Sequence, residues 1–167
     1  MEQEIIEFYS NTDDQSLSFL SNESKHPIII EDKKWPSVEH YLQSKKFEGT
    51  SLENEIRLAP SVFIAKNLSS PKYRIYYDQN KNRIVESSYG TINQNYSIRD
   101  DWEDVEEEFL KKAVYAKFDQ HPHLQEKLLE TRNVKFINLD NPLLGPILEE
   151  YRHTLREKIK GRSAINY

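Results

Sequence analysis

The chain has 167 residues, of which 37% are hydrophobic and 31% charged, and its formal net charge is −5 at pH 7. This length suffices for one domain with its own core, and 10 tyrosines and 7 phenylalanines are too many for a disordered chain. Cysteine is absent, which excludes disulfides, thiolate nucleophiles and cysteine-based zinc sites. The negative net charge gives no support for tight non-specific binding to nucleic acid, although an acidic protein can still act on a nucleic acid through a local basic pocket.

The sequence also predicts the cellular location of the protein and its division into domains. It contains no apolar run of membrane-spanning length, and Met1–Glu4 lacks the basic residues that open a secretory signal peptide. We therefore expect a soluble, cytoplasmic protein without a membrane partner. One domain is expected over residues 1–160, followed by a flexible tail at 161–167.

The first part of the chain predicts two short strands. Residues 5–9 alternate loosely, as a half-buried strand does, and residues 11–16 have the composition of a turn. Residues 27–30 predict a second strand, followed by a turn that ends at Trp35. The indole of Trp35 suits either the core or a stacking surface for a base, and its size and polarity favour the core.

A helix over residues 37–47 is the element around which we organise the rest. Pro36 suits the start of a helix and Ser37 is a good N-cap. No glycine or proline follows before the segment ends. The apolar residues that fall on one side of this helix, at i, i+3 and i+4, are Val38, Tyr41 and Leu42.

The same helix carries a polar face. Glu39, Gln43 and Lys46 lie at i, i+4 and i+7, within an arc of roughly 60°, so a carboxylate, an amide and an amine stand in line. In most helices such a face is simply solvated. Lys45 falls among the apolar positions, where it either reaches to solvent or is itself a desolvated amine. His40 points between the two faces.

The remaining chain predicts mainly helices. They are expected at 52–58, 61–68, 100–118, 124–130 and 144–159, with strands at 73–77, 83–86 and 134–138 and a turn at 139–142. We interpret the polar segment 71–98, which includes the hairpin, as an insertion. The acidic residues that crowd the start of the 100–118 helix suit its dipole and are interpreted as a solvated face. The predicted fold class is α+β, mainly helical with a few short strands.

Neither a metal nor a cofactor is expected. His121 and His123 have the spacing of metal ligands, but no cysteine exists in the chain and no carboxylate lies nearby at ligand spacing. A loop that opens the following helix accounts better for these histidines.

The segment Trp35–Phe47, with the pattern Trp-x-x-x-Glu-His-Tyr-x-Gln-x-x-Lys-Phe, resembles the signature helix of the NADAR family, also called YbiA-like. Phe19–Asn22 is similar to that family's Phe-Leu-Ser-Asn element, and Pro27–Trp35 is similar to its strand, turn and tryptophan. Segments that resemble the family's second half are Arg99–Trp102, Ala116–Phe118 and Leu128–Thr131. The resemblance covers most of residues 5–155, and the order of the segments is more specific than any one of them.

This resemblance implies a single NADAR-like domain and an N-glycosidase that cleaves a C1′–N bond. The family's substrates are early riboflavin-pathway intermediates or guanine bases that carry ADP-ribose. Breaking such a bond builds positive charge on the sugar, which the Glu39 carboxylate can stabilise, or Glu39 can activate water. A neutral lysine can attack C1′ and open the sugar to a Schiff base. Lys46, which matches the family's lysine before phenylalanine, is preferred over Lys45 for this role.

The resemblance also implies residues that contact the substrate. They are Ser21, Asn22, Trp35, His40, Gln43, Lys45, Asp140 and Asn141. The expected partner is ADP-ribosylated guanine in nucleic acid, or a small phosphorylated nucleoside-like substrate. The chain departs from the family after Asp140, where Asp140–Gly145 stands in place of a Trp-Gly and glycine-rich run. A non-catalytic module that binds an ADP-ribose-like nucleotide is therefore the alternative.

Overall fold

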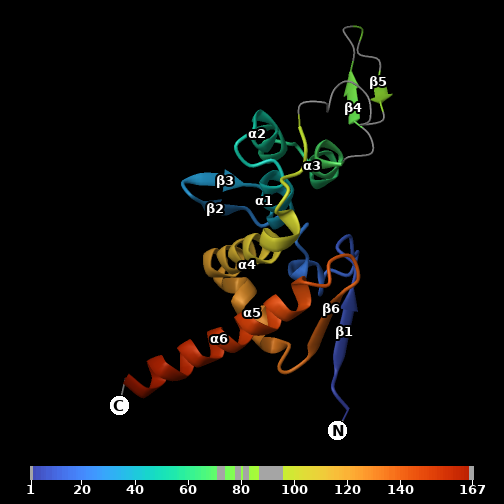
Figure 1. Ribbon diagram of the computed structural model, residues 1–167. Coiled ribbons are helices and arrows are strands. Elements are labelled where there is room, and N and C mark those ends of the chain that lie inside the picture. The colour runs from blue at the N-terminus through green and yellow to red at the C-terminus, as the bar shows by residue number, and fades with distance from the viewer. Residues whose placement is uncertain (1, 71–73, 78–79, 81–82, 87–95, 166–167) are drawn as a thin grey trace.

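The structure is a computed structural model that describes residues 2–70, 74–77, 80, 83–86 and 96–165 (Figure 1). For residues 74–77 and 83–86 the description is confined to the backbone. Within these ranges the elements are β1 (Ile5–Phe8), η1 (Ser18–Leu20), β2 (Ile28–Ile30), β3 (Lys33–Trp35), α1 (Val38–Lys45), α2 (Ser51–Arg57), α3 (Val62–Ser69), β4 (Arg74–Tyr77), β5 (Arg83–Glu86), α4 (Trp102–Gln120), α5 (Pro122–Glu130), β6 (Lys135–Asn138) and α6 (Leu144–Ile165). The predicted class, α+β and mainly helical, is confirmed.

The strands form three separate pairs. β1 and β6 pair in parallel, with Ile5 opposite Lys135, and so bring the start of the chain beside the segment that precedes α6 (Figure 1). β2 and β3 form an antiparallel hairpin whose turn residues, Glu31 and Asp32, have φ angles of 54° and 61°. Two left-handed residues are typical of the hairpin turns that match strand twist. β4 and β5 also pair antiparallel, which confirms the predicted hairpin, whereas most of the rest of 71–98 lies outside the described residues.

Helix α1 begins as the sequence predicts. The Ser37 side chain accepts a hydrogen bond from the His40 backbone N–H and so caps the helix. The backbone N–H of Glu39, a second N–H without a partner inside the helix, donates to the backbone carbonyl oxygen of Asn22 at an N–O distance of 2.9 Å. The apolar face packs into the main core with α4, and Figure 1 shows α2 and α3 on the other side of α1. Helix α1 is therefore covered from several directions.

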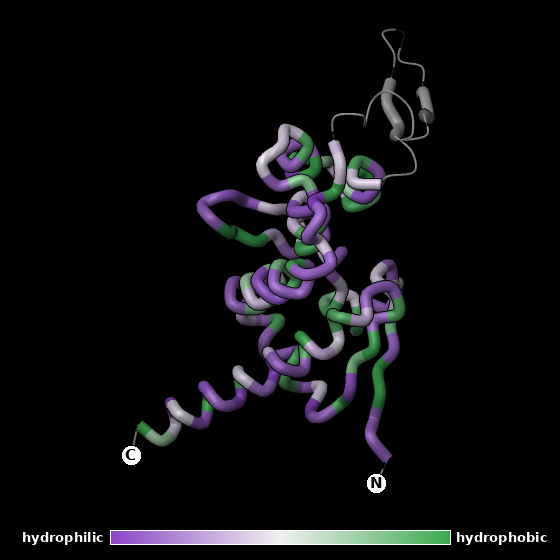
Figure 2. The backbone as a smooth tube through the Cα atoms, in the orientation of Figure 1, coloured by the Kyte–Doolittle hydropathy of each residue, from purple (hydrophilic) through white to green (hydrophobic). Residues whose placement is uncertain are grey.

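Several helix boundaries differ from the sequence prediction: α1 ends at Lys45 instead of residue 47, and α4 begins and ends two residues later than predicted. α5 begins at Pro122 rather than at Leu124, because proline is well tolerated at the first position of a helix. α6 continues beyond the predicted end at Ile159 to Ile165, so residues 161–165 belong to a helix rather than to a structureless tail. Residues 156–160, Arg-Glu-Lys-Ile-Lys, favour helix, and Gly161 by itself does not stop it. Figure 2 shows this end of α6 as mostly hydrophilic and projecting away from the other elements.

The first turn of α6 packs closely on β6 at a glycine. A Cβ at Gly145 would lie 2.1 Å from the backbone oxygen of Phe136, whereas a Cβ at Gly161 would meet no atom within 4 Å. We expect Gly145→Ala to lower the free energy of unfolding by about 1–3 kcal/mol, because backbone must move. Gly161→Ala, in the same helix, should raise it by up to about 1 kcal/mol. Urea unfolding of both variants checks this, and equal stability of the two would contradict the packing described.

Candidate active site

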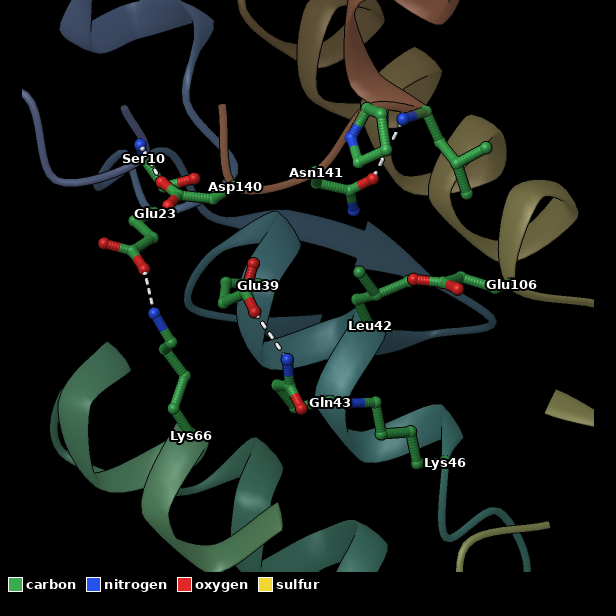
Figure 3. Close-up of a pocket in the computed structure, with 12 residues that line it drawn as sticks. Ser10, Glu23, Glu39, Leu42, Gln43, Lys46, Lys66, Glu106, Asp140 and Asn141 are labelled. Atoms are coloured by element: carbon green, nitrogen blue, oxygen red, sulfur yellow. Dashed lines mark hydrogen bonds and ion pairs between the residues drawn. The ribbon is translucent and has the colours of Figure 1, made fainter. Parts of the chain in front are cut away.

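A cavity of about 460 Å³ lies beside α1 (Figure 3). Its walls come from α1, α3, α4, the segment after η1 and the turn before α6. The residues that line it are Ser10, Glu23, Glu39, Leu42, Gln43, Lys46, Lys66, Glu106, Asp140, Asn141, Pro142 and Leu143. The polar face predicted for the 37–47 helix thus faces this cavity, not bulk solvent.

Glu39 and Gln43 are held in a fixed arrangement. The Gln43 Nε2 donates to Glu39 Oε1 at 2.6 Å (Figure 3), and the Gln43 Oε1 accepts a hydrogen bond from the Ser69 hydroxyl at 2.7 Å. Because the amide must donate on one side and accept on the other, Ser69 fixes the orientation of Gln43 and thereby of Glu39.

Burial sets the acidity of Glu39. This residue is 8% exposed. Desolvation raises the pKa of its carboxyl group, and this outweighs the hydrogen bond from Gln43 and the nearby charges of Lys66 and Lys46, which favour the carboxylate. A carboxyl group with a raised pKa gives up and takes back a proton at higher pH than a solvated carboxyl group does.

Lys46 is the amine that faces the cavity. Desolvation lowers its pKa below the ordinary lysine value, although the carboxylates of Glu39 and Glu106 oppose this shift. Its Nζ lies 5.8 Å from the centre of the Trp102 ring. Among the described residues, no carboxylate is close enough to form an ion pair with Lys46. A larger share of Lys46 is therefore the neutral, nucleophilic amine than for a solvated lysine.

Lys45 has a different environment. It is 3% exposed and its Nζ donates to Glu48 at 3.0 Å and to Glu53 at 3.1 Å. Burial opposes the charged form, but these two carboxylates outweigh it and raise the pKa of Lys45. Lys45 does not line the cavity, and its charge joins α1 to α2. This favours Lys46 over Lys45 as the reactive amine.

The segment after η1 is fixed by a buried lysine. Lys117 in α4 donates from Nζ to the backbone oxygens of Phe19 at 2.6 Å and Ser21 at 2.8 Å. Burial lowers the pKa of Lys117 to about 7, and a neutral amine still has the two N–H groups that these carbonyls need. Ser21 and Asn22 are buried and do not line the cavity.

Ser21 and Asn22 instead support their neighbours. The Ser21 hydroxyl donates to the backbone oxygen of Ser10 at 2.6 Å and accepts from the Glu23 N–H. The Asn22 carbonyl caps α1 at Glu39. Glu23, the next residue, reaches the cavity and forms an ion pair with Lys66 at 2.7 Å (Figure 3). The segment therefore holds α1 and Glu23 in place.

The turn before α6 brings Asp140 and Asn141 to the opposite wall, as expected from the resemblance. The Asn138 side-chain oxygen accepts from the backbone N–H groups of both residues. Asp140 accepts from the Ser10 N–H at 2.6 Å, and the Asn141 side-chain oxygen accepts from Leu143. Both residues line the cavity from an ordered turn.

Besides Ser21, Asn22 and Lys45, two further predicted contact residues do not line this cavity. Trp35 is 1% exposed and packs edge-on against Tyr41 in the core. His40 Nε2 donates to the Ala59 backbone oxygen at 3.1 Å, so in the neutral ring Nδ1 accepts from the Ser37 hydroxyl at 2.8 Å. Burial lowers the pKa of His40, which favours this neutral form. Its ring joins α1 to the segment between α2 and α3.

Sequence reasoning missed four polar residues of the cavity: Ser10, Glu23, Lys66 and Glu106. Glu23 follows directly on the Phe19–Asn22 element, and that proximity was a usable signal. Lys66 lies in the helix expected at 61–68, to which we assigned no role at the site, and Glu106 belongs to the acidic run that we interpreted as solvated. No local pattern distinguishes these two, because their place depends on how α3 and α4 pack against α1.

The histidines near α5 give no metal site. His26, His121 and His123 have ring centres 5.3–6.0 Å apart, but within the described part of the chain no group of histidines and carboxylates has the geometry to hold a metal ion. His121 Nε2 donates to the Pro27 carbonyl instead. Over the same part, none of the helices combines the length and apolar character that crossing a membrane requires.

The cavity combines a carboxyl group of raised pKa, an amine of lowered pKa and an amide that fixes the carboxyl group. Such a set suits proton transfer and attack at a carbon that develops positive charge, as an anomeric carbon does. The carboxylates of Glu23, Glu106 and Asp140 also face the cavity and favour positive charge there. The arrangement can therefore support hydrolysis or group transfer at such a carbon.

Residues 6–142 match the NADAR domain model, and the chain belongs to this family. It is 33% identical over 137 residues to N-glycosidase YbiA of Escherichia coli K12, covering 82% of this chain and 71% of that protein. The NMR structure of E. coli YbiA has a TM-score of 0.68 at 27% identity, covering 95% of this chain and 88% of the other. The chloroplastic riboflavin biosynthesis protein PYRR of Zea mays is 29% identical over 141 residues, covering 78% of this chain and 19% of that protein.

The two adjacent lysines should contribute to stability with opposite signs. Lys45→Met removes the cation from partly buried Glu53 and exposed Glu48, and should cost about 1–3 kcal/mol of unfolding free energy. Lys46→Met removes a desolvated charge without an ion pair among the described residues, and should leave stability unchanged or raise it by about 0.5 kcal/mol. Urea unfolding of the two variants at pH 7 measures the difference. Equal destabilisation would refute the distinction drawn between them.

Proposed function

We propose that the protein is an N-glycosidase that hydrolyses a C1′–N ribosidic bond in the cavity beside α1. The observation that carries this is the joint placement of buried Glu39 and cavity-facing Lys46 on one helix face, with Gln43 between them. The relatives named N-glycosidase YbiA support the reaction class, since they match over most of the chain.

The residues suggest a two-stage reaction. The neutral Lys46 amine attacks C1′ while the bond from C1′ to the base nitrogen breaks; the base takes up a proton, and the amine loses one. Opening of the sugar ring then leaves a Schiff base at Lys46. Water adds to this carbon, with Glu39 accepting its proton, and the amine leaves. The net reaction adds one water across the glycosidic bond.

For the substrate, we propose guanine in nucleic acid that carries ADP-ribose on the base. The resemblance of Trp35–Phe47 to the NADAR signature supports this choice, as does a second, basic hollow described below. A phosphoribosylaminopyrimidine of the riboflavin pathway is the second candidate, favoured by relatives named riboflavin biosynthesis proteins. Incubation with an ADP-ribosylated oligonucleotide and, separately, with the pyrimidine, followed by chromatography, distinguishes the two by the sugar released. If neither sugar is released while ADP-ribose binds, the protein is a binding module.

Substitution of the two central residues should abolish turnover without unfolding the protein. We expect Glu39→Gln and Lys46→Ala each to lower kcat by about 10²–10⁴-fold, and the double variant to be little worse than Lys46→Ala, because without the lysine no Schiff base forms for Glu39 to hydrolyse. Lys111→Ala is the matched control, since Lys111 forms an ion pair with Glu150 on the surface. Borohydride added during turnover should attach the sugar to wild-type protein and not to Lys46→Ala. Wild-type turnover in both variants would refute the mechanism.

The pH dependence of kcat should follow Lys46. Because desolvation lowers the pKa of Lys46, the neutral amine forms at lower pH than in a free lysine, and kcat should rise as pH rises through that pKa. The Glu106 carboxylate raises the pKa of Lys46, so Glu106→Gln should move the rise to lower pH while leaving Glu39 in place. An unmoved profile in Glu106→Gln would show that another group controls the rate.

A further inference from the structure

A second hollow, of about 890 Å³, adjoins the first at the other side of the α1 N-terminus. The residues that line it are Glu23, Lys25, Pro27, Lys34, Pro36, Ser37, His40, Arg57, Leu58, Pro60, Ser61, Val62 and Phe63. Glu23 lines both cavities, so the two hollows adjoin at this residue, which forms an ion pair with Lys66. We call the second hollow the basic groove.

Positive side chains outnumber carboxylates in the basic groove, whereas carboxylates outnumber lysines in the cavity. Lys25, Lys34 and Arg57 come from three separate segments of the chain, and among the described lining residues Glu23 is the single carboxylate. Within the described ranges none of the three cations forms an ion pair with a carboxylate. Arg57 donates to the Asn54 side chain and the Lys34 backbone oxygen, which hold its position without neutralising it. The groove therefore suits an anion with several charges.

The groove also exposes apolar side chains. Phe63 is 63% exposed and Leu58 is 62% exposed, although both are large and hydrophobic. An exposed aromatic ring beside cations is typical of surfaces on which bases of a single strand stack while their phosphates are neutralised. A pocket for a free nucleotide would instead enclose most of its ligand.

The floor of the groove is rigid. His40 contributes its ring there and joins Ser37 to the Ala59 carbonyl through two hydrogen bonds. Ser61 caps α3, which carries Phe63, by accepting from the Ile64 N–H. The start of α1 and the start of α3 are thus held next to each other, and the groove exists before any ligand arrives.

We propose that the basic groove binds the single nucleic-acid strand that flanks the modified base, with phosphates on Lys25, Lys34 and Arg57 and a base on Phe63. This rests on the proposed function, since it assumes that the cavity takes the sugar and base of the scissile bond. The cavity, lined by four carboxylates and two lysines, disfavours phosphates, whereas the groove next to it attracts them.

The test is binding, so it does not depend on cleavage. A fluorescein-labelled, unmodified single-stranded DNA of about twelve nucleotides is titrated with each protein at low salt, and fluorescence anisotropy is measured. We expect Phe63→Ala and the double variant Lys25→Ala/Lys34→Ala each to weaken binding about tenfold, with a shallower salt dependence for the double variant. The matched control, Lys111→Ala/Lys112→Ala, removes the same charge from surface pairs elsewhere and should bind as wild type does. Thermal unfolding verifies that each variant is folded.

Calorimetry with ADP-ribose tests whether the groove binds the nucleic-acid strand or the diphosphate of the ADP-ribose group. If the groove takes the strand, ADP-ribose affinity stays within twofold of wild type in the groove variants. Parallel loss of ADP-ribose binding would overturn the proposal and assign the groove to the diphosphate, as would an absence of DNA binding by the wild-type protein. Loss of activity in Glu39→Gln with DNA binding intact leaves the groove supported, whatever substrate the cavity cleaves.

Discussion

The desolvation of α1 is the constraint on which the site depends. This short helix packs against α2, α3 and α4, and its polar residues cannot all reach water. The same burial that raises the pKa of Glu39 lowers that of Lys46. Burial thus disfavours the charged form of both groups, and a larger share of neutral amine is what nucleophilic attack by a lysine requires.

Buried polar contacts hold this helix from both ends. At the N-terminus, Lys117 fixes the Phe19–Ser21 carbonyls, and the next residue, Asn22, caps Glu39. Toward the C-terminus, Lys45 is bound by Glu48 and Glu53. None of these residues touches the cavity, yet each fixes a group that does. Two lysines of the chain are therefore committed to structure while a third, Lys46, is left for chemistry.

Acidic and basic residues lie in two separate hollows, and in our proposal each hollow takes a different part of the substrate. The cavity gathers carboxylates around one developing cation, and the basic groove gathers cations around a hydrophobic patch. An overall charge of −5 obscures this arrangement. The local electrostatic potential, and not the net charge, decides which surface of an acidic protein binds a phosphate group.

The sequence by itself determined the elements that depend on local rules: the Ser37 cap, the helical spacing that aligns Glu39, Gln43 and Lys46, and the family signature in Trp35–Phe47. It favoured Lys46 over Lys45 as the reactive amine, but it could not show that Lys45 is paired with Glu48 and Glu53 while Lys46 faces the cavity, because these surroundings depend on how distant segments pack. Tertiary structure likewise decided that Trp35 and His40 turn away from the cavity while Lys66 and Glu106 face it. These outcomes depend on packing between distant segments, and packing sets the burial and partner charges from which each pKa follows.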